Sequence, residues 1–456
     1  MNKLHLLLIT ALLLAADVAF TQSISGGYYH SLSVCTADST AYACGRNNSG
    51  ELGDGTNTDK NTAVQVSALT GITAVAGGSD HSHFVKNDGT VWACGRNLYG
   101  QLGDGTNTDT NTPVQVSGLS GITAVAAGYR HSIFLKNDGT VWACGYNFYG
   151  QLGDGTNTDT NTPVQVSGLS GITAVEAGDA HSIFLKNDGT GWACGRNNFG
   201  QLGDGTNTDT NTPVQVSGLT GITVVAAGAY HSLFLKNDST VWACGFNFYG
   251  QLDDGTNINK NTAVQVSGLI GIGAVAAGYE HSLFLKNDGT VWACGSNGGG
   301  QLGDGTNTAT NTPVQVSGLT GIVAAAAGGY HSLFLKNDGT VWACGRNDFG
   351  QLGNGTNITL NFPVLQLSGG CPPLGIPGHS MKDEFKVWPN PTEGKFRVSS
   401  LEFGVAVQVF DLLGREIASP PQADRNDGIV VDLSSYPAGI YFVRVGERTQ
   451  KLILSK

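Results

Sequence analysis

The chain has 456 residues, of which 67 are glycine and only 13% are charged. This composition suits tight turns between short strands better than helices, and the length exceeds that of a single core, so several units are expected. The excess of 35 acidic over 24 basic side chains, without clusters of Lys and Arg, argues against nucleic acid as a partner.

Residues 1–22 have the pattern of a signal peptide. Lys3 supplies a positive start, an apolar stretch follows, and small residues at 16–19 provide a cleavage region. The alternatives are an apolar first strand or a retained anchor, but the stretch is short for crossing a bilayer. No later segment approaches a membrane span. We therefore expect a soluble, monomeric mature protein that is secreted or displayed at the cell surface via the periplasm.

A unit of 50 residues recurs seven times within residues 23–370. The copy that begins at Gly128 reads GYRHSIFLKNDGTVWACGYNFYGQLGDGTNTDTNTPVQVSGLSGITAVAA. Periods of about 20 to 50 residues are typical of solenoids, propellers or arrays, in which one unit cannot bury its apolar face alone. The register of the repeat is marked by His30, His81, His131, His181, His231, His281 and His331.

Each repeat contains four short apolar segments separated by turn residues. In the third copy these segments are 122–128, 131–137, 140–145 and 163–168. The Asn-Asp-Gly triplet at 137–139 is a hairpin signal, and no segment has a helical apolar period. Four antiparallel strands repeated seven times predict an all-β fold, a seven-bladed β-propeller.

The two ends of the repeat region indicate a closed ring. The last repeat stops after its segment at 363–367, and residues 22–27 precede the first histidine in the place of the missing piece. We expect this N-terminal strand to complete the last blade, which would remove the exposed strand edges of an open array.

The repeated motif carries a family resemblance. Gly-x-x-His-Ser, followed by Asn-Asp-Gly-Thr-Val-Trp-Ala-x-Gly-x-Asn-x-x-Gly-Gln-Leu-Gly, resembles the repeat of the regulator of chromosome condensation family, whose fold is a seven-bladed propeller. The resemblance spans about residues 23–370. The best-known member promotes guanine-nucleotide exchange, but the uniform spacing, the export signal and the acidity argue against that activity here. Single copies depart from the motif at Tyr42, Gly191, Ser239, Asp253 and Asn354, which should loosen single blades without changing the fold.

A linker at residues 371–385 leads to a different unit, residues 386–456. Alternating apolar strands with Gly, Asn and Pro turns predict a small β-sandwich. The segments Pro389-Asn390-Pro391, Gly414-Arg415 and Pro437-Ala438-Gly439 resemble the type A C-terminal sorting domain of the type IX (Por) secretion system. The resemblance implies contact with that machinery and outer-membrane translocation in Bacteroidetes-like bacteria. The alternative is an ordinary accessory β-domain.

Nine cysteines in an exported chain raise the question of disulfides. Seven of them occupy one equivalent position per repeat, where successive copies are too far apart to bridge, so we interpret them as buried packing residues. Cys35 and Cys371 lie outside this pattern. A closed ring would bring them together, and we hypothesise that they form a disulfide.

The histidines and the long loops are the candidates for chemistry. The seven repeat histidines, each followed by Ser, suit a structural role, and His83 suits the surface better than a metal site. The loop residues Asp154, Asn157, Asp159 and Asn161 offer the oxygen ligands that calcium prefers. The loop has no bidentate Glu, however, and such residues more often bond their own backbone, so we favour self-capping turns. We predict no cofactor and no catalytic residue.

Near-identical copies differ from one another at two places: the pair before each His, and the variable positions in Cys-Gly-x-Asn-x-x-Gly. The first place contains Tyr28, Tyr29, Asp80, Tyr129, Arg130, Asp179, Tyr230, Tyr279, Glu280 and Tyr330. The second contains Arg46, Arg96, Tyr99, Tyr146, Phe148, Tyr149, Arg196, Phe199, Phe246, Phe248, Tyr249, Arg346 and Phe349.

Because the hairpin is antiparallel, both places should lie on one face of the ring. Tyr, Phe and Arg are enriched at binding hot spots, so we expect a non-catalytic module that recognises an extracellular protein or glycan. The alternatives are a secreted enzyme acting on polysaccharide, with Asp80, Asp179 and Glu280 as its acidic candidates, or a structural or adhesion component. For Phe199 and Phe349 we favour the interpretation that they pack between blades as structural wedges.

Overall fold

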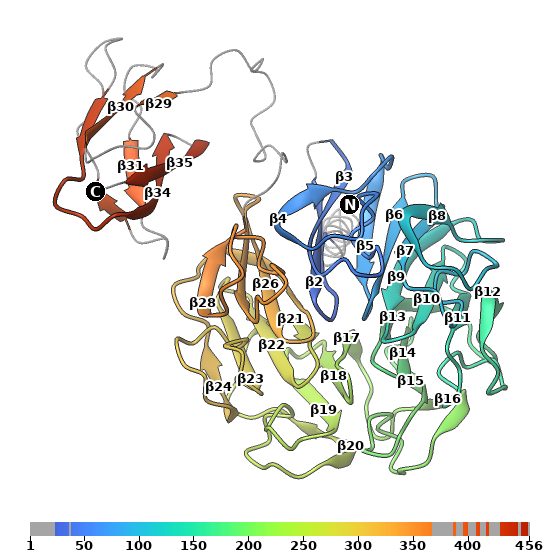
Figure 1. The fold of residues 1–456 in the computed structure, drawn as a ribbon. Coiled ribbons are helices and arrows are strands. Elements are labelled where there is room, and N and C mark those ends of the chain that lie inside the picture. The colour runs from blue at the N-terminus through green and yellow to red at the C-terminus, as the bar shows by residue number, and fades with distance from the viewer. Residues whose placement is uncertain are drawn as a thin grey trace, which may run out of the picture. The chain divides into compact units, whose positions relative to one another are not determined.

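A computed structural model of the chain describes residues 23–35, 38–366, 386–388, 395–399, 407–410, 416–418, 429–445 and 448–454. The chain divides into two compact units, Met1–Cys371 and Pro372–Lys456. In the first unit, seven four-stranded antiparallel sheets surround a central axis as blades (Figure 1). This arrangement confirms the predicted all-β, seven-bladed propeller. The signal peptide and the linker lie outside the described residues.

The four strands of each blade follow one another in chain order from the central axis outward. The innermost strands are β1 (Ile24–Gly26), β5 (Ile72–Gly77), β9 (Ile122–Ala127), β13 (Ile172–Ala177), β17 (Ile222–Ala227), β21 (Ile272–Ala277) and β25 (Ile322–Ala327). The second strands are β2 (His30–Cys35), β6 (His81–Lys86), β10 (His131–Lys136), β14 (His181–Lys186), β18 (His231–Lys236), β22 (His281–Lys286) and β26 (His331–Lys336).

The third strands carry the Trp-Ala-Cys segments and the outermost carry the Asn-Thr segments. The third strands are β3 (Thr40–Gly45), β7 (Val91–Gly95), β11 (Val141–Gly145), β15 (Gly191–Gly195), β19 (Val241–Gly245), β23 (Val291–Gly295) and β27 (Val341–Gly345). The outermost strands are β4 (Lys60–Gln65), β8 (Thr110–Gln115), β12 (Thr160–Gln165), β16 (Thr210–Gln215), β20 (Lys260–Gln265), β24 (Thr310–Gln315) and β28 (Leu360–Leu365).

The N-terminal strand does not complete the last blade, so the predicted mode of closure is wrong. Strand β1 pairs with β2 inside the first blade, with Gly26 opposite Ser31. The last blade already has its own inner strand, β25, which pairs with β26. The physical reason is the phase of the repeat: each blade begins at the apolar segment before the histidine, so it is one continuous stretch of chain.

Side-chain hydrogen bonds between blades hold the ring together. Nε2 of His131 lies 3.0 Å from Oγ of Ser182 in the next blade. That hydroxyl donates its proton to the main-chain oxygen of Gln151, 2.6 Å away, so the imidazole must be the donor. The same contact joins all seven neighbouring pairs: His30–Ser82, His81–Ser132, His131–Ser182, His181–Ser232, His231–Ser282, His281–Ser332 and His331–Ser31.

These histidines are uncharged, because burial lowers their pKa. The pKa falls to about 3 for His131 and to about 4 for His331, whose bond to Ser31 joins the last blade to the first. A Cβ on Gly128 would overlap the ring of His131, and this explains the glycine three residues before each histidine. The predicted structural role of the seven histidines is confirmed.

The seven repeat cysteines are buried and free, which confirms them as packing residues. Each thiol points at the carbonyl that also accepts the serine proton; Sγ of Cys194, for example, lies 3.6 Å from the oxygen of Gln151. Burial raises the pKa of these thiols above their ordinary value. Cys35 is disulfide-bonded. Cys371 lies outside the described residues, so their pairing stays a prediction.

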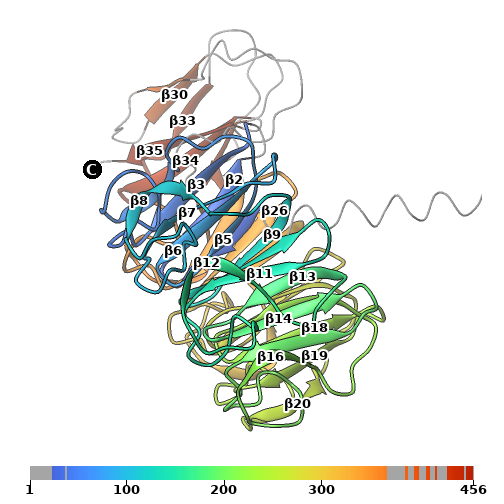
Figure 2. The ribbon, with the colours of Figure 1, turned by 90° about the vertical axis from the view of Figure 1, so that its right-hand side faces the viewer.

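Hydrophobic clusters fill the interfaces between neighbouring blades. In the cluster between the second and third blades, Val85 and Leu102 pack with Phe134 and Cys144. The side view shows neighbouring sheets packed face to face (Figure 2). Because every interface repeats the same contacts, the backbone is almost invariant from blade to blade. Ser239 and Asp253, which replace glycine, keep the positive φ of the other copies, at 62° and 52°.

The described segments of the second unit form two antiparallel sheets. Their strand orders are β29 (Lys386–Trp388), β30 (Lys395–Ser399), β33 (Ile429–Asp432) and β32 (Glu416–Ala418), β31 (Val407–Phe410), β34 (Gly439–Val445), β35 (Arg448–Leu454). Val409, Val443 and Leu452 are buried in it. Within the described parts of the chain, no helix has the length and apolar character needed to cross a membrane.

His83 is fully buried, so its expected place at the surface is wrong. It occupies the position that Ile133 or Leu233 takes in other blades, and it stacks on Phe134 with ring centroids 5.3 Å apart. Neither ring nitrogen has a hydrogen-bond partner among the described residues. Burial therefore holds its pKa well below 6.5.

Replacing His83 with leucine should stabilise the propeller. We expect His83→Leu to raise the free energy of unfolding by about 1–3 kcal/mol, because it removes buried polar atoms without partners. The gain should grow by about 1.4 kcal/mol per pH unit below about pH 6, since only the unfolded wild type takes up that proton. Urea unfolding at several pH values measures both effects. The matched variant Leu233→His should show the opposite sign, and equal stability of all three proteins would contradict this account.

Candidate functional site

The two variable sets lie on one face of the propeller. The main-chain nitrogen of Tyr146 donates to the oxygen of Arg130 at 2.8 Å, and the corresponding bond exists in each of the other blades. We call this surface the variable face. It comprises Tyr28, Tyr29, Arg46, Asp80, Arg96, Tyr99, Tyr129, Arg130, Tyr146, Phe148, Tyr149, Asp179, Arg196, Phe199, Tyr230, Phe246, Phe248, Tyr249, Tyr279, Glu280, Tyr330, Arg346 and Phe349.

Tyrosines from several blades meet across the central axis on this face. The ring of Tyr28, from the first blade, lies 6.0 Å from Tyr129 of the third blade and 5.2 Å from Tyr279 of the sixth. Its hydroxyl lies 3.1 Å from that of Tyr330. Tyr230 adds a hydroxyl contact of 3.1 Å to Tyr279. We call these five residues the tyrosine cluster; contacts between non-adjacent blades place it over the mouth of the channel.

Two tyrosines of the cluster, Tyr28 and Tyr230, are held in their uncharged form. Burial raises the pKa of Tyr28 and Tyr230 far above the ordinary value of 10. The hydroxyl of Tyr230 also bonds the Asp179 carboxylate. Burial raises the pKa of Asp179 to about 7, against the opposing effect of that bond, and it also raises the pKa of Glu280. Two acidic groups with elevated pKa values thus lie beside the cluster.

Asp80 is held in an ion-pair network. Its carboxylate lies 3.1 Å from Nη1 of Arg46 and 3.7 Å from Nη1 of Arg96, and the residue is 8% exposed. Two guanidinium groups on neighbouring blades therefore share one buried carboxylate. This arrangement orients both arginines and leaves Asp80 with little access to a substrate.

Arginines on the variable face are held against aromatic rings. The guanidinium carbon of Arg130 lies 4.9 Å from the centroid of Tyr99 and 4.8 Å from that of Tyr129. Arg196 lies 5.3 Å from Tyr230, and Arg346 lies 5.3 Å from Tyr29. Cation–π contacts of this kind fix the charged group before any ligand arrives.

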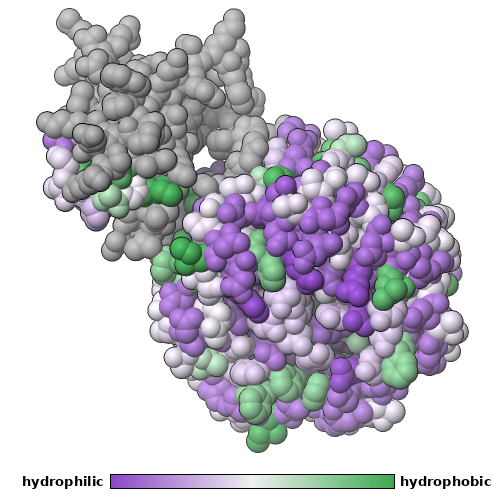
Figure 3. Space-filling model, viewed as in Figure 1, coloured by the Kyte–Doolittle hydropathy of each residue, from purple (hydrophilic) through white to green (hydrophobic). Residues whose placement is uncertain are grey.

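Phenylalanines project from the rim of the same face. Phe148 and Phe248 are each 64% exposed, and each stacks on the aromatic residue two positions earlier, Tyr146 or Phe246, at 6.3 Å. Hydrophobic residues elsewhere form small separate patches on a largely hydrophilic surface in the view of Figure 3. Exposed rings supported by other rings are the part of this face most accessible to a partner.

Phe199 and Phe349 lie between blades, in agreement with the interpretation that they are structural wedges. Phe199 lies 5.5 Å from Tyr230 and 4.9 Å from Phe246, both in the following blade. Phe349 lies 5.1 Å from Tyr29 across the junction of the last and first blades. Both rings are partly buried. They support the exposed residues around them.

A channel of about 1190 Å³ runs along the inner strands. It is lined by Glu176, a residue that the sequence patterns did not single out. Glu176 lines the channel at the end of β13 and is partly buried. Burial raises its pKa to about 8. The residues at its level in the other blades are Ser25, Ala76, Ala126, Ala226, Ala276 and Ala326. The signal was present in the sequence, as one glutamate among copies that carry alanine.

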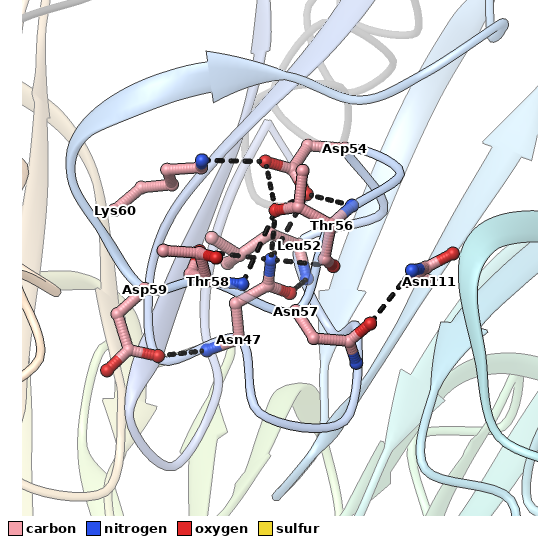
Figure 4. A network of polar contacts seen from close by, with 9 residues as sticks. All are labelled: Asn47, Leu52, Asp54, Thr56, Asn57, Thr58, Asp59, Lys60 and Asn111. Carbon is pink, nitrogen blue, oxygen red and sulfur yellow. Dashed lines mark hydrogen bonds and ion pairs between the residues drawn. The ribbon is translucent and has the colours of Figure 1, made fainter.

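The long loops are held by their own hydrogen bonds. In the first blade, Asn47 Nδ2 donates to Asp54 Oδ1 at 3.1 Å, and the main-chain nitrogen of Asn47 donates to Asp59 Oδ1 at 2.8 Å (Figure 4). Asn111 of the next blade donates to Asn57 Oδ1 at 2.8 Å, which ties neighbouring loops together. The loop carboxylates therefore already accept protein donors.

The third-copy loop, the candidate for calcium, follows the same pattern. Asp154 Oδ1 accepts from the main-chain nitrogen of Thr156 at 2.9 Å, and Asp159 Oδ1 accepts from that of Asn147 at 2.7 Å. Asn157 and Asn161 bond asparagines of adjacent blades. These bonds favour the self-capping interpretation. In the described portion of the chain, no three His, Cys, Asp or Glu side chains are grouped so that they could hold a metal ion.

Replacing Glu176 with glutamine should remove a pH dependence of stability. Between about pH 4.5 and pH 8, the unfolded chain releases the Glu176 proton while the folded protein retains it, so the wild type loses stability as the pH rises. We expect the stability advantage of Glu176→Gln to grow through this range and then level off. Urea unfolding of both proteins across that range tests this. A constant difference would show that the carboxyl titrates normally.

Comparison with known families identifies both units. The family model of the Regulator of chromosome condensation (RCC1) repeat matches residues 38–85, 88–135, 138–185, 188–235, 238–285, 288–335 and 338–369. The family model of the Secretion system C-terminal sorting domain matches residues 386–456. No curated protein matches the sequence.

Solved structures share the propeller fold. Human WBSCR16 is 25% identical with a TM-score of 0.62, and the match covers 67% of this chain and 84% of that one. Yeast RCC1 (Prp20), in complex with Kap60, is 21% identical with a TM-score of 0.66, covering 76% and 86%. Prp20p from Saccharomyces cerevisiae, in another structure, is 23% identical with a TM-score of 0.64, covering 75% and 87%. Because the repeat matches extend over most of its length, this chain belongs to the RCC1 repeat family, and it ends in a type IX secretion sorting domain.

Proposed function

We propose that the propeller is a non-catalytic binding module whose variable face recognises an extracellular protein or glycan. The location of the protein supports an extracellular partner, since the sorting domain indicates secretion or cell-surface delivery by the type IX machinery. The observation that carries the proposal is the exposure of Phe148 and Phe248, at 64% each, on a face that also carries arginines held by aromatic rings.

The composition and rigidity of the variable face suit recognition. Tyr, Trp and Arg dominate binding hot spots, and rigid aromatic side chains lose little conformational entropy when a partner binds. Arg130 is fixed both by its rings and by a hydrogen bond of 3.0 Å to the hydroxyl of Tyr99. Aromatic faces also stack on sugar rings, so a glycan suits this surface as well as a protein does.

Two other functions fit the surface less well. Of the acidic candidates for an enzyme acting on polysaccharide, Asp80 is already shared by two arginines and Asp179 is bonded to Tyr230. A purely structural or adhesive role would not require exposed aromatic rings on one face only. Guanine-nucleotide exchange has no support, because likeness to the yeast structures at 21% and 23% identity concerns the fold alone.

Removing the exposed and charged anchors should weaken binding. We expect the triple variant Phe148→Ala, Phe248→Ala, Arg130→Ala to lose at least about tenfold in affinity, because hot-spot side chains contribute about 2 kcal/mol or more each. A glycan array and a panel of purified bacterial surface proteins supply the partners, and surface plasmon resonance measures the affinity.

The matched control is Ile270→Ala. Ile270 is an exposed apolar residue, but it lies at the edge of the blade opposite the variable face, because the carbonyl of its neighbour Gly271 accepts a hydrogen bond from the turn at Asn287. This variant should bind like the wild type. Unchanged binding by the triple variant would reject the variable face as the site, and release of reducing sugar from any polysaccharide would favour the enzyme.

Removing residues 386–456 should stop export at the periplasm. We expect the truncated propeller to accumulate there, because the sorting domain is the signal that the type IX machinery reads. Fractionation and immunoblotting of a type IX-competent host measure the distribution. The full-length chain, expressed in the same host, serves as the control, and undiminished surface delivery of the shortened chain would contradict the role of this domain.

A further inference from the structure

We propose that the channel holds a second site, which binds a small organic cation of the quaternary-ammonium class. Glu176 is the counter-ion, and the tyrosine cluster at the channel mouth supplies the aromatic rings that contact the cation. This site is separate from the proposed recognition of a protein or glycan on the rim. It rests on the cavity, on one unpaired carboxylate and on the rings that meet across its mouth.

The carboxylate of Glu176 has no partner of its own. No hydrogen bond or ion pair joins it to another of the described residues, and burial is the sole cause of its raised pKa. The contrast with Asp179, which is bonded to Tyr230 and lies near Arg196, is clear. An ionised carboxylate in an apolar surrounding is costly unless it is paired. A cation in the channel would supply the missing charge.

The wall around Glu176 suits an apolar cation. At its level the other blades contribute one serine and five alanines, Ser25 among them, and Val125, Val175 and Val225 also line the cavity. Small side chains leave room beside the glutamate that larger ones would fill. Methyl groups on a charged nitrogen can lie against such a wall without losing hydrogen bonds, whereas a hydrated metal ion cannot.

The tyrosine cluster closes the same end of the channel. Tyr28, Tyr129 and Tyr279 line the cavity, and so does Asp179, three residues after Glu176. Aromatic rings attract cations through their π faces, and cages of such rings recognise quaternary ammonium groups. Once ionised, the two carboxyl groups join the rings in presenting negative potential to one volume.

Other charged groups that face the cavity do not cancel this potential. Lys236 and Lys286 line its opposite end, and their ammonium groups lie 3.4 Å and 3.6 Å from Asp238 and Asp288. Glu280 follows Tyr279 at the tyrosine end and adds a further acidic group. Tyr28, Tyr230 and Tyr279 stay protonated there, because burial raises their pKa.

Isothermal titration of the mature full-length protein with choline tests the proposal. The titration is run at about pH 9, where Glu176, with a pKa of about 8, is ionised and choline keeps its charge. The comparison ligand is the neutral isostere of choline, in which carbon replaces nitrogen. We expect choline to bind at least about tenfold more tightly than the isostere, and Glu176→Ala to remove that preference.

The repeat offers matched controls. Glu176→Ala installs the residue that other blades carry, so the variant should fold, and Ala226→Glu in that background moves the carboxylate to the equivalent place in the next blade. The relocated carboxylate should restore the preference. Equal affinity for choline and its isostere, or choline binding that Glu176→Ala leaves unchanged, would overturn the proposal. The pair Phe148→Ala, Phe248→Ala should leave choline binding intact, so failure of the channel site and failure of the rim site are distinguishable.

Discussion

The hydrogen bond from each histidine to the serine of the next blade is the interaction on which the rest of the structure depends. Its donor is an imidazole that burial keeps neutral, and its acceptor is a serine hydroxyl whose own proton goes to a main-chain oxygen. It also needs a glycine three residues earlier, where a Cβ would strike the ring. The motif Gly-x-x-His-Ser therefore contains the residues that form one interface between blades. Its seven copies close the ring, since His331 of the last blade bonds Ser31 of the first.

Because the glycine, histidine and serine of the motif form the interface, the two positions between the glycine and the histidine can vary. Those two side chains take no part in the histidine–serine bonds that join the blades, yet the turn that carries them lies at the channel mouth. Copies can therefore differ there without loss of the ring, and the same holds after each Cys-Gly pair, where Tyr146 and Arg130 are joined only through the main chain. A rigid, almost invariant scaffold can present a chemically varied face, which is what a binding module requires.

Sequence patterns predicted the propeller, its four-stranded blades, the buried cysteines and the shared face, because all of these follow from periodicity and antiparallel pairing. The phase of the repeat was not predictable, since a tandem array can be cut at any point and only the pairing of Gly26 with Ser31 shows where a blade begins. The contact of Tyr28 with Tyr279 was not predictable either, because it depends on the width of the channel. Glu176 and His83 were visible as odd copies, but a strand position alone does not tell whether its side chain reaches a cavity.

The contrast between His83 and Glu176 shows how position decides the meaning of an exceptional copy. Both replace an apolar residue in a strand near the axis, and neither finds a protein partner among the described residues. His83 is buried between blades at 0% exposure, so neither water nor a ligand can reach its ring nitrogens. It stays neutral, and its unpaired polar atoms lower the stability of the fold. Glu176 borders a cavity of about 1190 Å³ that a solute can enter, so the free energy lost by burying its charge is recoverable through binding. A buried polar side chain without a partner therefore only destabilises the protein at His83, whereas at Glu176 it can bind a ligand.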